Sequence, residues 1–183
     1  MRKGLVIILG LVLCLAFAPA AFADRSGDAT AHVYVWVDPN ITVNVVTGNV
    51  DLGSVQTGEF SGSIEFRVDS NVEQVGLWCA VSNLYKGDLN DGFVDPIQVS
   101  GPATIAPTNA TPQAGGSNVG ALDVDADVNG LPGKIMAGPI FFESSQDGHF
   151  SQNVLVSCGW NQDDPEKTIG EYSGFVILYA IIL

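Results

Sequence analysis

Apolar and polar side chains alternate with a period of two along most of this chain, and this alternation constrains the fold more than any other feature. Between Ala31 and Val37, alanine and valine occupy every second position, and His32, Tyr34 and Trp36 lie between them. Such alternation is typical of β-strands with one buried face. The alternating segments are 29–37, 41–46, 63–68, 75–81, 121–128, 134–142, 150–158 and 174–183.

Helical periodicity is absent after residue 23. No segment there keeps apolar residues at helical spacing over three turns. The 21 glycines and 9 prolines of the chain favour many turns between short strands. The pattern therefore predicts an all-β protein, either a sandwich or a barrel.

One segment interrupts the alternation. From Pro96 to Leu122 the chain has no charged residue and is rich in Pro, Thr, Ala and Gly. This composition is typical of a long surface loop. We expect that loop at about 101–120, beside a short strand at Ile97–Ser100. We do not interpret this loop as a linker between two domains, because the part of the chain on either side of it would be too small to bury a core alone. We therefore assign 24–183 to a single domain.

The N-terminus has the features of a secretory signal peptide. Arg2 and Lys3 precede an apolar run from Leu5 to Phe17, and Ala21 and Ala23 form an A-x-A cleavage site. We therefore expect the signal peptide to be removed after Ala23. The product is expected to be secreted, periplasmic or held at the cell surface.

The charge balance excludes some partners. Removal of residues 1–23 would leave 160 residues, in which five Lys and Arg oppose 20 Asp and Glu for a net charge of −15. We expect no nucleic-acid partner, because phosphate binding draws on Lys and Arg. No later apolar run reaches the roughly 18–20 residues of a membrane helix. We therefore expect no membrane insertion once the signal peptide is removed.

Two cysteines, Cys79 and Cys158, remain after processing. Both lie in alternating segments, where they share a face with apolar residues and should point inward. Export permits a disulfide, and one closing a loop of about 80 residues would stabilise the fold by about 4 kcal/mol. We predict a Cys79–Cys158 disulfide, with two buried free thiols as the alternative.

The sequence DADVNG, which starts at Asp125, matches the opening of an EF-hand calcium loop. On that interpretation Asp125, Asp127 and Asn129 would supply oxygen ligands. The twelfth position, however, is Met136, where the loop needs a bidentate glutamate. A strand that ends in a tight turn explains the same residues without an ion.

A second acidic segment, KGDLNDGFVD, starts at Lys86 and is similar to the dockerin or EF-hand calcium loop with one residue missing. Its candidate ligands for a weaker calcium site are Asp88, Asn90, Asp91 and Asp95. As a connection between strands it needs no ion, because Asn, Asp and Gly favour turns. We expect no cofactor, with calcium as the alternative.

Residues able to carry catalysis are scarce. His32 and His149 are the two histidines, and no nucleophile-elbow, zinc-protease or phosphate-loop motif occurs. We expect a protein that is not an enzyme and assign no catalytic residue.

Three tryptophans, Trp36, Trp78 and Trp160, raise carbohydrate binding as an alternative, because flat aromatic faces beside carboxylates suit sugars. In a β-sandwich, tryptophans more often fill or flank the core. Alternation directs Trp36 and Trp78 away from the faces that carry valine and cysteine.

Both ends of the mature chain are predicted strands with unusual surfaces. The last segment, Gly174–Leu183, is apolar on both faces, so it is either central to a core or covered by another chain. The first, Thr30–Val37, follows only a few polar residues and could pair with the sheet edge of another subunit. We expect protein partners at the cell surface, or self-association through these terminal strands.

Two stretches carry a family resemblance. VDLGSVQTGEFSGSIEFRVDSN, followed by VGLWCAV, and the ending GEYSGFVILYAIIL resemble small exported bacterial Ig-like sandwiches, among them spore coat protein U-like domains and chaperone–usher pilus subunits. The resemblance implies an Ig-like antiparallel β-sandwich of about 8–10 strands. The ending differs from the pilin pattern at Ile182, where tyrosine is usual.

Together these features predict an exported, non-enzymatic structural or adhesive protein of the bacterial surface. One alternative is a pilus or fibre subunit assembled by donor-strand exchange, with Thr30–Val37 as the donor and Gly174–Leu183 beside the acceptor site. A carbohydrate- or calcium-binding module is the other.

Overall fold

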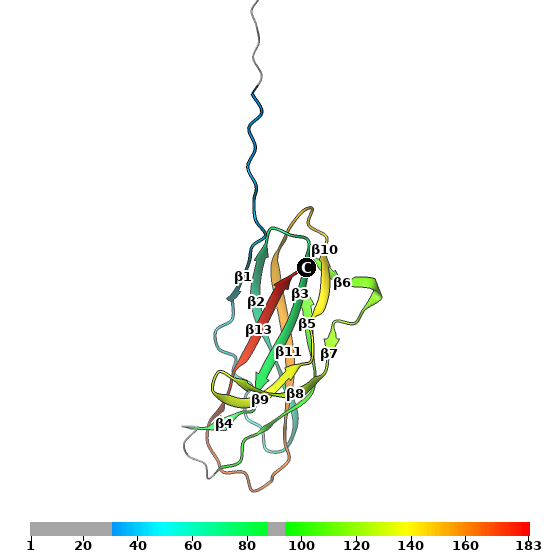
Figure 1. Cartoon of the computed structure of the whole chain (residues 1–183). Coiled ribbons are helices and arrows are strands. Elements are labelled where there is room, and N and C mark those ends of the chain that lie inside the picture. The colour runs from blue at the N-terminus through cyan, green and yellow to red at the C-terminus, as the bar shows by residue number, and fades with distance from the viewer. Residues whose placement is uncertain (1–30, 88–93) are drawn as a thin grey trace, which may run out of the picture. The chain divides into compact units, whose positions relative to one another are not determined.

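Two antiparallel β-sheets form the fold, as predicted (Figure 1). The computed structural model describes residues 31–87 and 94–183. The predicted signal peptide, 1–23, and the first donor residue, Thr30, lie outside these residues. The chain divides into an N-terminal segment that ends at Val37 and a larger unit, Asp38–Leu183, which contains the described strands.

Each sheet combines segments from both halves of the sequence. Sheet A contains, in spatial order, β1 (Ile41–Val45), β2 (Gly58–Ser70), β11 (Phe150–Gln162), β5 (Gln98–Pro107) and β7 (Val119–Gly120). Sheet B contains β6 (Ala110–Pro112), β10 (Ile140–Ser144), β3 (Gln74–Ser82), β9 (Leu131–Met136), β8 (Leu122–Val128) and β13 (Val176–Ile182). The described residues also form a short pair, β4 (Tyr85–Lys86) with β12 (Tyr172–Ser173), and one 3-10 turn, η1 (Gln113–Gly115).

The apolar core lies between the inner faces of the two sheets. Val68, Ile105 and Phe150 contribute from sheet A, and Leu77 and Phe142 contribute from sheet B; all five are fully buried. Burial of a side chain of this size contributes about 1.5–3 kcal/mol to folding. The alternation seen in the sequence therefore marks the two inner faces correctly.

Trp160 connects the two sheets directly. It lies on β11 in sheet A, and its Nε1–H donates a hydrogen bond of 2.9 Å to the carbonyl oxygen of Ser82 on β3 in sheet B. Its ring stacks on Phe60 with the ring centroids 6.1 Å apart. Phe60 is the aromatic residue of GEFSG, the phrase with which β2 begins.

The predicted loop at 101–120 is wrong. Those residues contain most of β5, together with β6, η1 and β7. Ala103 and Ile105 of β5 are fully buried, and β5 pairs with β11 on one side and β7 on the other. The segment lacks charge because part of it is core. Its residues Gly101 and Pro102 lie within β5, and Gly115 and Gly116 lie between β6 and β7.

Two other predicted strands differ from the structure. The single strand expected at 134–142 is divided into β9 and β10, with Gly138 and Pro139 between them. The strand expected at 29–37 is also wrong for the described chain, because residues 31–37 belong to no sheet. An alternating sequence becomes a strand only where it finds a partner strand.

Six of the described strands follow the order of an immunoglobulin-type sandwich. In that fold, strands A, B, E and D form one sheet, and strands C, F and G form the other. Here the order β1-β2-β11-β5 corresponds to A-B-E-D, and the pair β3-β13 corresponds to C-F. No strand of the described residues takes the place of G beside β13.

Candidate functional site

The last strand, β13, lies at an edge of sheet B. It pairs antiparallel with β3 along its length, from Val176 opposite Val81 to Ile182 opposite Val75. β9 and β10 follow one another along the opposite side of β3, and no other described strand pairs with β13. One row of its backbone N–H and C=O groups is therefore left to pair with another strand.

The inward side chains of β13 leave the core open at this edge. Leu178 is buried, whereas Val176 and Ala180 pack against the core and remain partly exposed. The inward residues of the neighbouring strand β3, such as Leu77 and Val81, are fully buried. We call this surface the β13 edge, meaning the unpaired side of Val176–Ile182 and the core side chains beside it.

Strand β1 borders the β13 edge from the other sheet. β1 and β13 contact each other, and β1 is itself the outermost strand of sheet A. Ile41 and Val43 of β1 also pack against the core while partly exposed. Apolar core residues therefore reach the surface where the two sheet edges meet.

The outward side chains of β13 are apolar or aromatic as well. Ile177, Tyr179 and Ile181 point away from the core, and Ile181 is 38% exposed. The ring of Tyr179 stacks on Trp78 of β3 with centroids 5.3 Å apart and an angle of 16° between the planes. Both faces of this edge strand therefore carry apolar side chains, whereas edge strands commonly carry charged ones.

The N-terminal segment carries a second unpaired strand sequence. Val33 and Val35 are 89% and 84% exposed, and Trp36 is 84% exposed. The rings of His32 and Tyr34 stack with centroids 5.7 Å apart, which fits an extended chain in which every second side chain points the same way. The valines therefore share one face, and His32, Tyr34 and Trp36 share the other.

The start of the sandwich unit is held in place by Asn71. Its Oδ1 accepts a hydrogen bond of 2.7 Å from the Asn40 N–H, and its Nδ2 donates one of 2.9 Å to the carbonyl oxygen of Asp38. The Ser70 hydroxyl donates to the carbonyl oxygen of Asn40 at 2.8 Å. The chain is thus fixed at the point where it enters β1.

The predicted Cys79–Cys158 disulfide is not formed, and both cysteines are free and buried. Cys79 lies on β3 and Cys158 on β11, in different sheets. Facing sheets pack about 10 Å apart, whereas the Cα atoms of a disulfide usually lie within about 7 Å. The alternative of two buried thiols describes this structure.

Burial keeps both thiols protonated. It raises the pKa of Cys79 from 9.0 to about 12. The pKa of Cys158 is also raised to about 12, by burial first and then by the charge of Cys79. We expect the native protein at pH 8 to resist a soluble thiol reagent, while both thiols react once urea unfolds the chain. Rapid labelling of the native protein would contradict their burial.

The same shifts predict a loss of stability in alkali. Between about pH 9 and pH 12 the unfolded chain releases thiol protons that the folded chain keeps. The free energy of unfolding should therefore fall as pH rises, by about 1.4 kcal/mol per pH unit for each thiol. Urea titrations of the parent and of a Cys79→Ala, Cys158→Ala variant measure this, and equal slopes for the two proteins would contradict it.

The residues proposed as calcium ligands at 125–129 have other partners. Asp125 forms an ion pair with Lys134 on the neighbouring strand. Oδ1 of Asp127 accepts a hydrogen bond of 2.7 Å from the Gly130 N–H. Asn129, with a φ of 56°, forms the turn that joins β8 to β9, so the strand-and-turn interpretation describes this segment.

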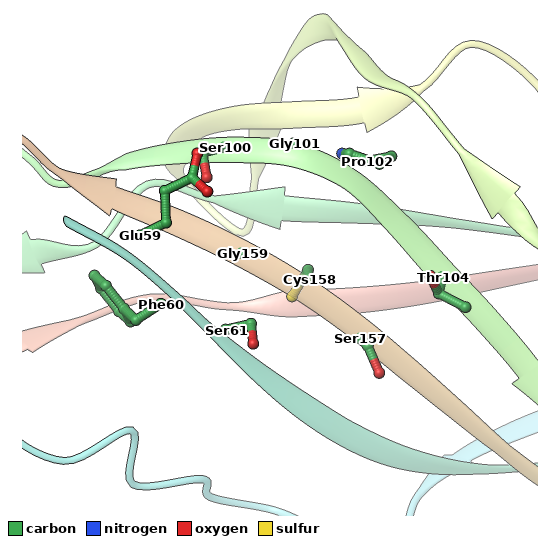
Figure 2. Close-up of a pocket in the computed structure, with 10 residues that line it drawn as sticks. All are labelled: Glu59, Phe60, Ser61, Ser100, Gly101, Pro102, Thr104, Ser157, Cys158 and Gly159. Atoms are coloured by element: carbon green, nitrogen blue, oxygen red, sulfur yellow. The ribbon is translucent and has the colours of Figure 1, made fainter.

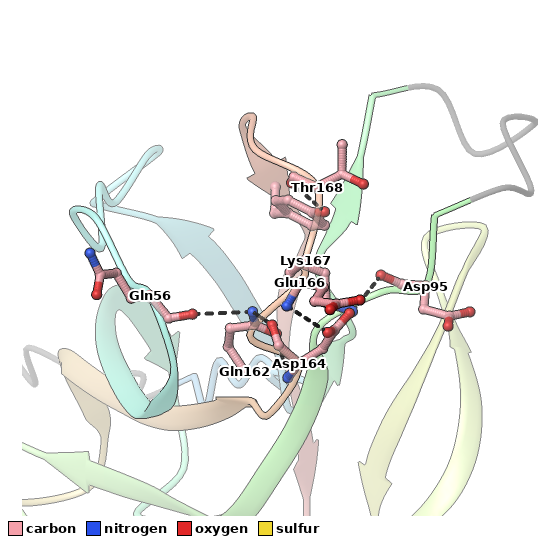
Figure 3. Close-up of polar contacts among 8 residues, drawn as sticks. Gln56, Asp95, Gln162, Asp164, Glu166, Lys167 and Thr168 are labelled. Carbon is pink, nitrogen blue, oxygen red and sulfur yellow. Dashed lines mark hydrogen bonds and ion pairs between the residues drawn. The ribbon is translucent and has the colours of Figure 1, made fainter.

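The other acidic segment is only partly described. Asp88, Asn90 and Asp91 lie outside the described residues. The carbonyl oxygen of Asp95 accepts a hydrogen bond of 3.1 Å from Nζ of Lys167 (Figure 3). In the described ranges, no group of three or more His, Cys, Asp or Glu side chains is arranged to hold a metal ion.

The loop that leads to β13 is held by its own hydrogen bonds (Figure 3). The buried Gln162 Nε2 donates to the carbonyl oxygens of Gln56 at 3.2 Å and Asp164 at 2.6 Å. The Tyr172 hydroxyl, from the phrase GEYSG, donates to the carbonyl oxygen of Thr168 at 2.9 Å. These bonds fix the path of the chain into its last strand.

A shallow depression of about 320 Å³ lies on the outer side of sheet A (Figure 2). Hydroxyl groups of serine and threonine line it, together with Glu59 and the edge of Cys158. Its lining contains no histidine or lysine that could activate a hydroxyl group. His149 lies elsewhere, exposed in a turn, with Nδ1 3.0 Å from the carbonyl oxygen of Asp147.

The two tryptophans of the sandwich unit, Trp78 and Trp160, lie in different sheets. Trp160 is buried, and Trp78 has one face covered by Tyr179. Sugar binding uses an open ring face, and the stacking covers the face of Trp78 that lies toward Tyr179. The Trp78–Tyr179 pair was missed in the sequence because cross-strand neighbours depend on register.

In the part of the chain that the structure describes, no helix is long and apolar enough to cross a membrane. A scan of protein-family models finds no family that matches this chain, and a search of curated proteins finds no match.

Proposed function

We propose that this protein is the subunit of a fibre on the bacterial surface, in which residues 30–37 of one copy add a strand to the β13 edge of the next. The observation that carries this proposal is that β13 is an edge strand with apolar side chains on both faces. The same chain supplies an alternating segment that pairs with nothing in the described residues. The proposed role is structural or adhesive, and the exported protein would carry it out as part of the fibre.

The two surfaces are chemically matched. An added strand would direct Val33, Val35 and Val37 toward the open core beside β13, and its backbone would satisfy the free N–H and C=O groups of that edge. Each valine that becomes buried contributes about 1.5–3 kcal/mol. The added strand would occupy the position that strand G has in a complete immunoglobulin-type domain.

Chain direction favours a second copy as the donor. β1 starts at Ile41 opposite Ser70, and β13 ends at Ile182 opposite Val75, so both points lie at the same end of the sandwich. A segment folded back from β1 within one chain would therefore run parallel to β13. A strand from another copy can run antiparallel, as every described strand pair does, and antiparallel pairing is slightly more stable.

Removal of the donor segment tests the proposal. We expect the mature chain, 24–183, to elute from a size-exclusion column as a series of polymers, and a chain without residues 30–37 to elute as a monomer. The truncated chain should also unfold at a lower temperature than the polymer, because its β13 edge stays uncovered. A mature chain that is a stable monomer, with the same melting temperature as the truncated chain, would contradict the proposal.

A further inference from the structure

We propose that Tyr34 of the added strand stacks on Tyr179 and extends the Trp78–Tyr179 pair into a stack of three rings across the subunit boundary. This inference rests on the proposed strand addition. It assigns the register of that addition and names the side chain that selects it.

The existing pair has the spacing of the sheet itself. The centroids of Trp78 and Tyr179 are 5.3 Å apart with 16° between the ring planes, and neighbouring strands lie about 4.7–4.9 Å apart. The two residues are direct cross-strand partners on β3 and β13. The rings therefore stack along the direction in which strands are added.

Tyr179 has a second ring face available on the side of the free edge. Trp78 covers the face toward β3, and no described strand pairs with β13 on its other side. A strand added there would bring its outward side chains one strand spacing from Tyr179. An aromatic side chain at the position opposite Tyr179 would continue the stack.

The burial of the donor valines determines which aromatic residue of the donor strand lies opposite Tyr179. If Tyr34 lies opposite Tyr179 in an antiparallel pair, the inward donor residues 37, 35, 33 and 31 lie opposite 176, 178, 180 and 182. Every inward position of β13 is then covered by valine or alanine. A shift of two residues, which would put Trp36 opposite Tyr179, leaves residue 176 uncovered.

The neighbours of this stack are also suited to it. In the centred register Trp36 lies opposite Ile177 and His32 opposite Ile181, so the outward residues of the donor cover the half-exposed isoleucines of β13. Tyr34 is 72% exposed in the N-terminal segment. Stacking would remove part of that apolar surface from water.

Peptide binding to a full-length acceptor tests the stack. The acceptor is the mature chain with Val35→Lys, which disables its own donor segment, and the donors are labelled synthetic peptides of residues 24–37. We expect Tyr34→Leu in the peptide to weaken binding about 3- to 10-fold. The same change should have little effect when the acceptor also carries Tyr179→Leu.

Two control variants separate stacking from general apolar contact. Trp36→Leu in the peptide should weaken binding by the same factor for both acceptors, because Trp36 does not face Tyr179. Tyr179→Phe keeps the ring and should restore the sensitivity to Tyr34→Leu.

The outcomes distinguish the stack from the strand addition. If the peptides bind but Tyr34→Leu has the same effect on both acceptors, the stack is wrong and strand addition stands. If Trp36→Leu is the change that depends on Tyr179, the register is shifted by two residues and our assignment is wrong. If no peptide binds the parent acceptor, the proposed function fails as well.

Discussion

Val35→Lys will hold the mature chain as a monomer under conditions in which the parent chain forms polymers. Val35 is the central inward residue of the proposed donor strand, opposite Leu178 in the centred register. The substitution loses the burial of a valine, about 1.5–3 kcal/mol, and places an ammonium group in an apolar site, which costs several kcal/mol more. Association should therefore weaken by at least about 1,000-fold.

Light scattering after size exclusion measures this effect. Val35→Ile is the matched control, since it keeps an apolar β-branched side chain and should still polymerise. His32→Lys adds the same charge to the opposite face of the segment and should polymerise too. A Val35→Lys chain with the same polymer distribution as the parent would contradict the assignment of Val35 to the buried face.

Trp160→Ala is expected to lower the free energy of unfolding by about 3–5 kcal/mol. Trp160 is 3% exposed, stacks on Phe60 and carries the hydrogen bond from β11 to Ser82 on β3. The alanine variant loses the buried ring and the bond between the sheets together. For a domain of this size such a loss is a large part of the total stability.

Urea unfolding in the monomeric Val35→Lys background measures the effect without interference from assembly. Trp160→Phe keeps an aromatic ring and removes the indole N–H, so it should cost about 1–3 kcal/mol. If the phenylalanine variant is as unstable as the alanine variant, the hydrogen bond carries more of the stability than the packing does. If Trp160→Ala costs less than about 1 kcal/mol, Trp160 does not connect the sheets as described.

Several strands of this fold could be predicted from the sequence because the signal is local, whereas most of β5 and all of β6 and β7 lie in the segment that was predicted to be a loop. Segments such as 75–81 and 150–158 alternate, and their inward residues, including Leu77 and Val154, are buried. In 75–81 the small outward residues Gly76 and Ala80 are buried as well. The same pattern predicted an all-β sandwich or barrel, and the family resemblance favoured the sandwich. The split of 134–142 into two strands was also signalled, by Gly138 and Pro139 within the segment.

The sequence pattern did not show which strands pair with each other. β2 pairs with β11, about 90 residues later in the chain, and no local pattern encodes that choice. The predicted disulfide had the correct inward direction for both cysteines and the wrong separation, because alternation gives a face and not a distance across the core. The edge position of β13 follows from the strand order, so it became visible only in the structure.

The predicted donor segment also shows that the sequence does not identify the partner of a strand. Residues 31–37 have the alternation of a strand but pair with no described strand. A sequence pattern reports which residues are suited to pairing and cannot report whether the partner lies in the same chain. That question is the central one for this protein.

Co-refolding of intact mature chains with chains that lack residues 30–37 tests most directly whether the donor segment pairs with another copy of the chain. The truncated chain has a β13 edge and no donor, so it should end each polymer that reaches it. Analytical ultracentrifugation should show the mean polymer size falling as the truncated fraction rises, toward dimers of one intact and one truncated chain at equal amounts. A size distribution of the intact chain that is unaffected by the truncated chain would contradict assembly by strand addition at β13.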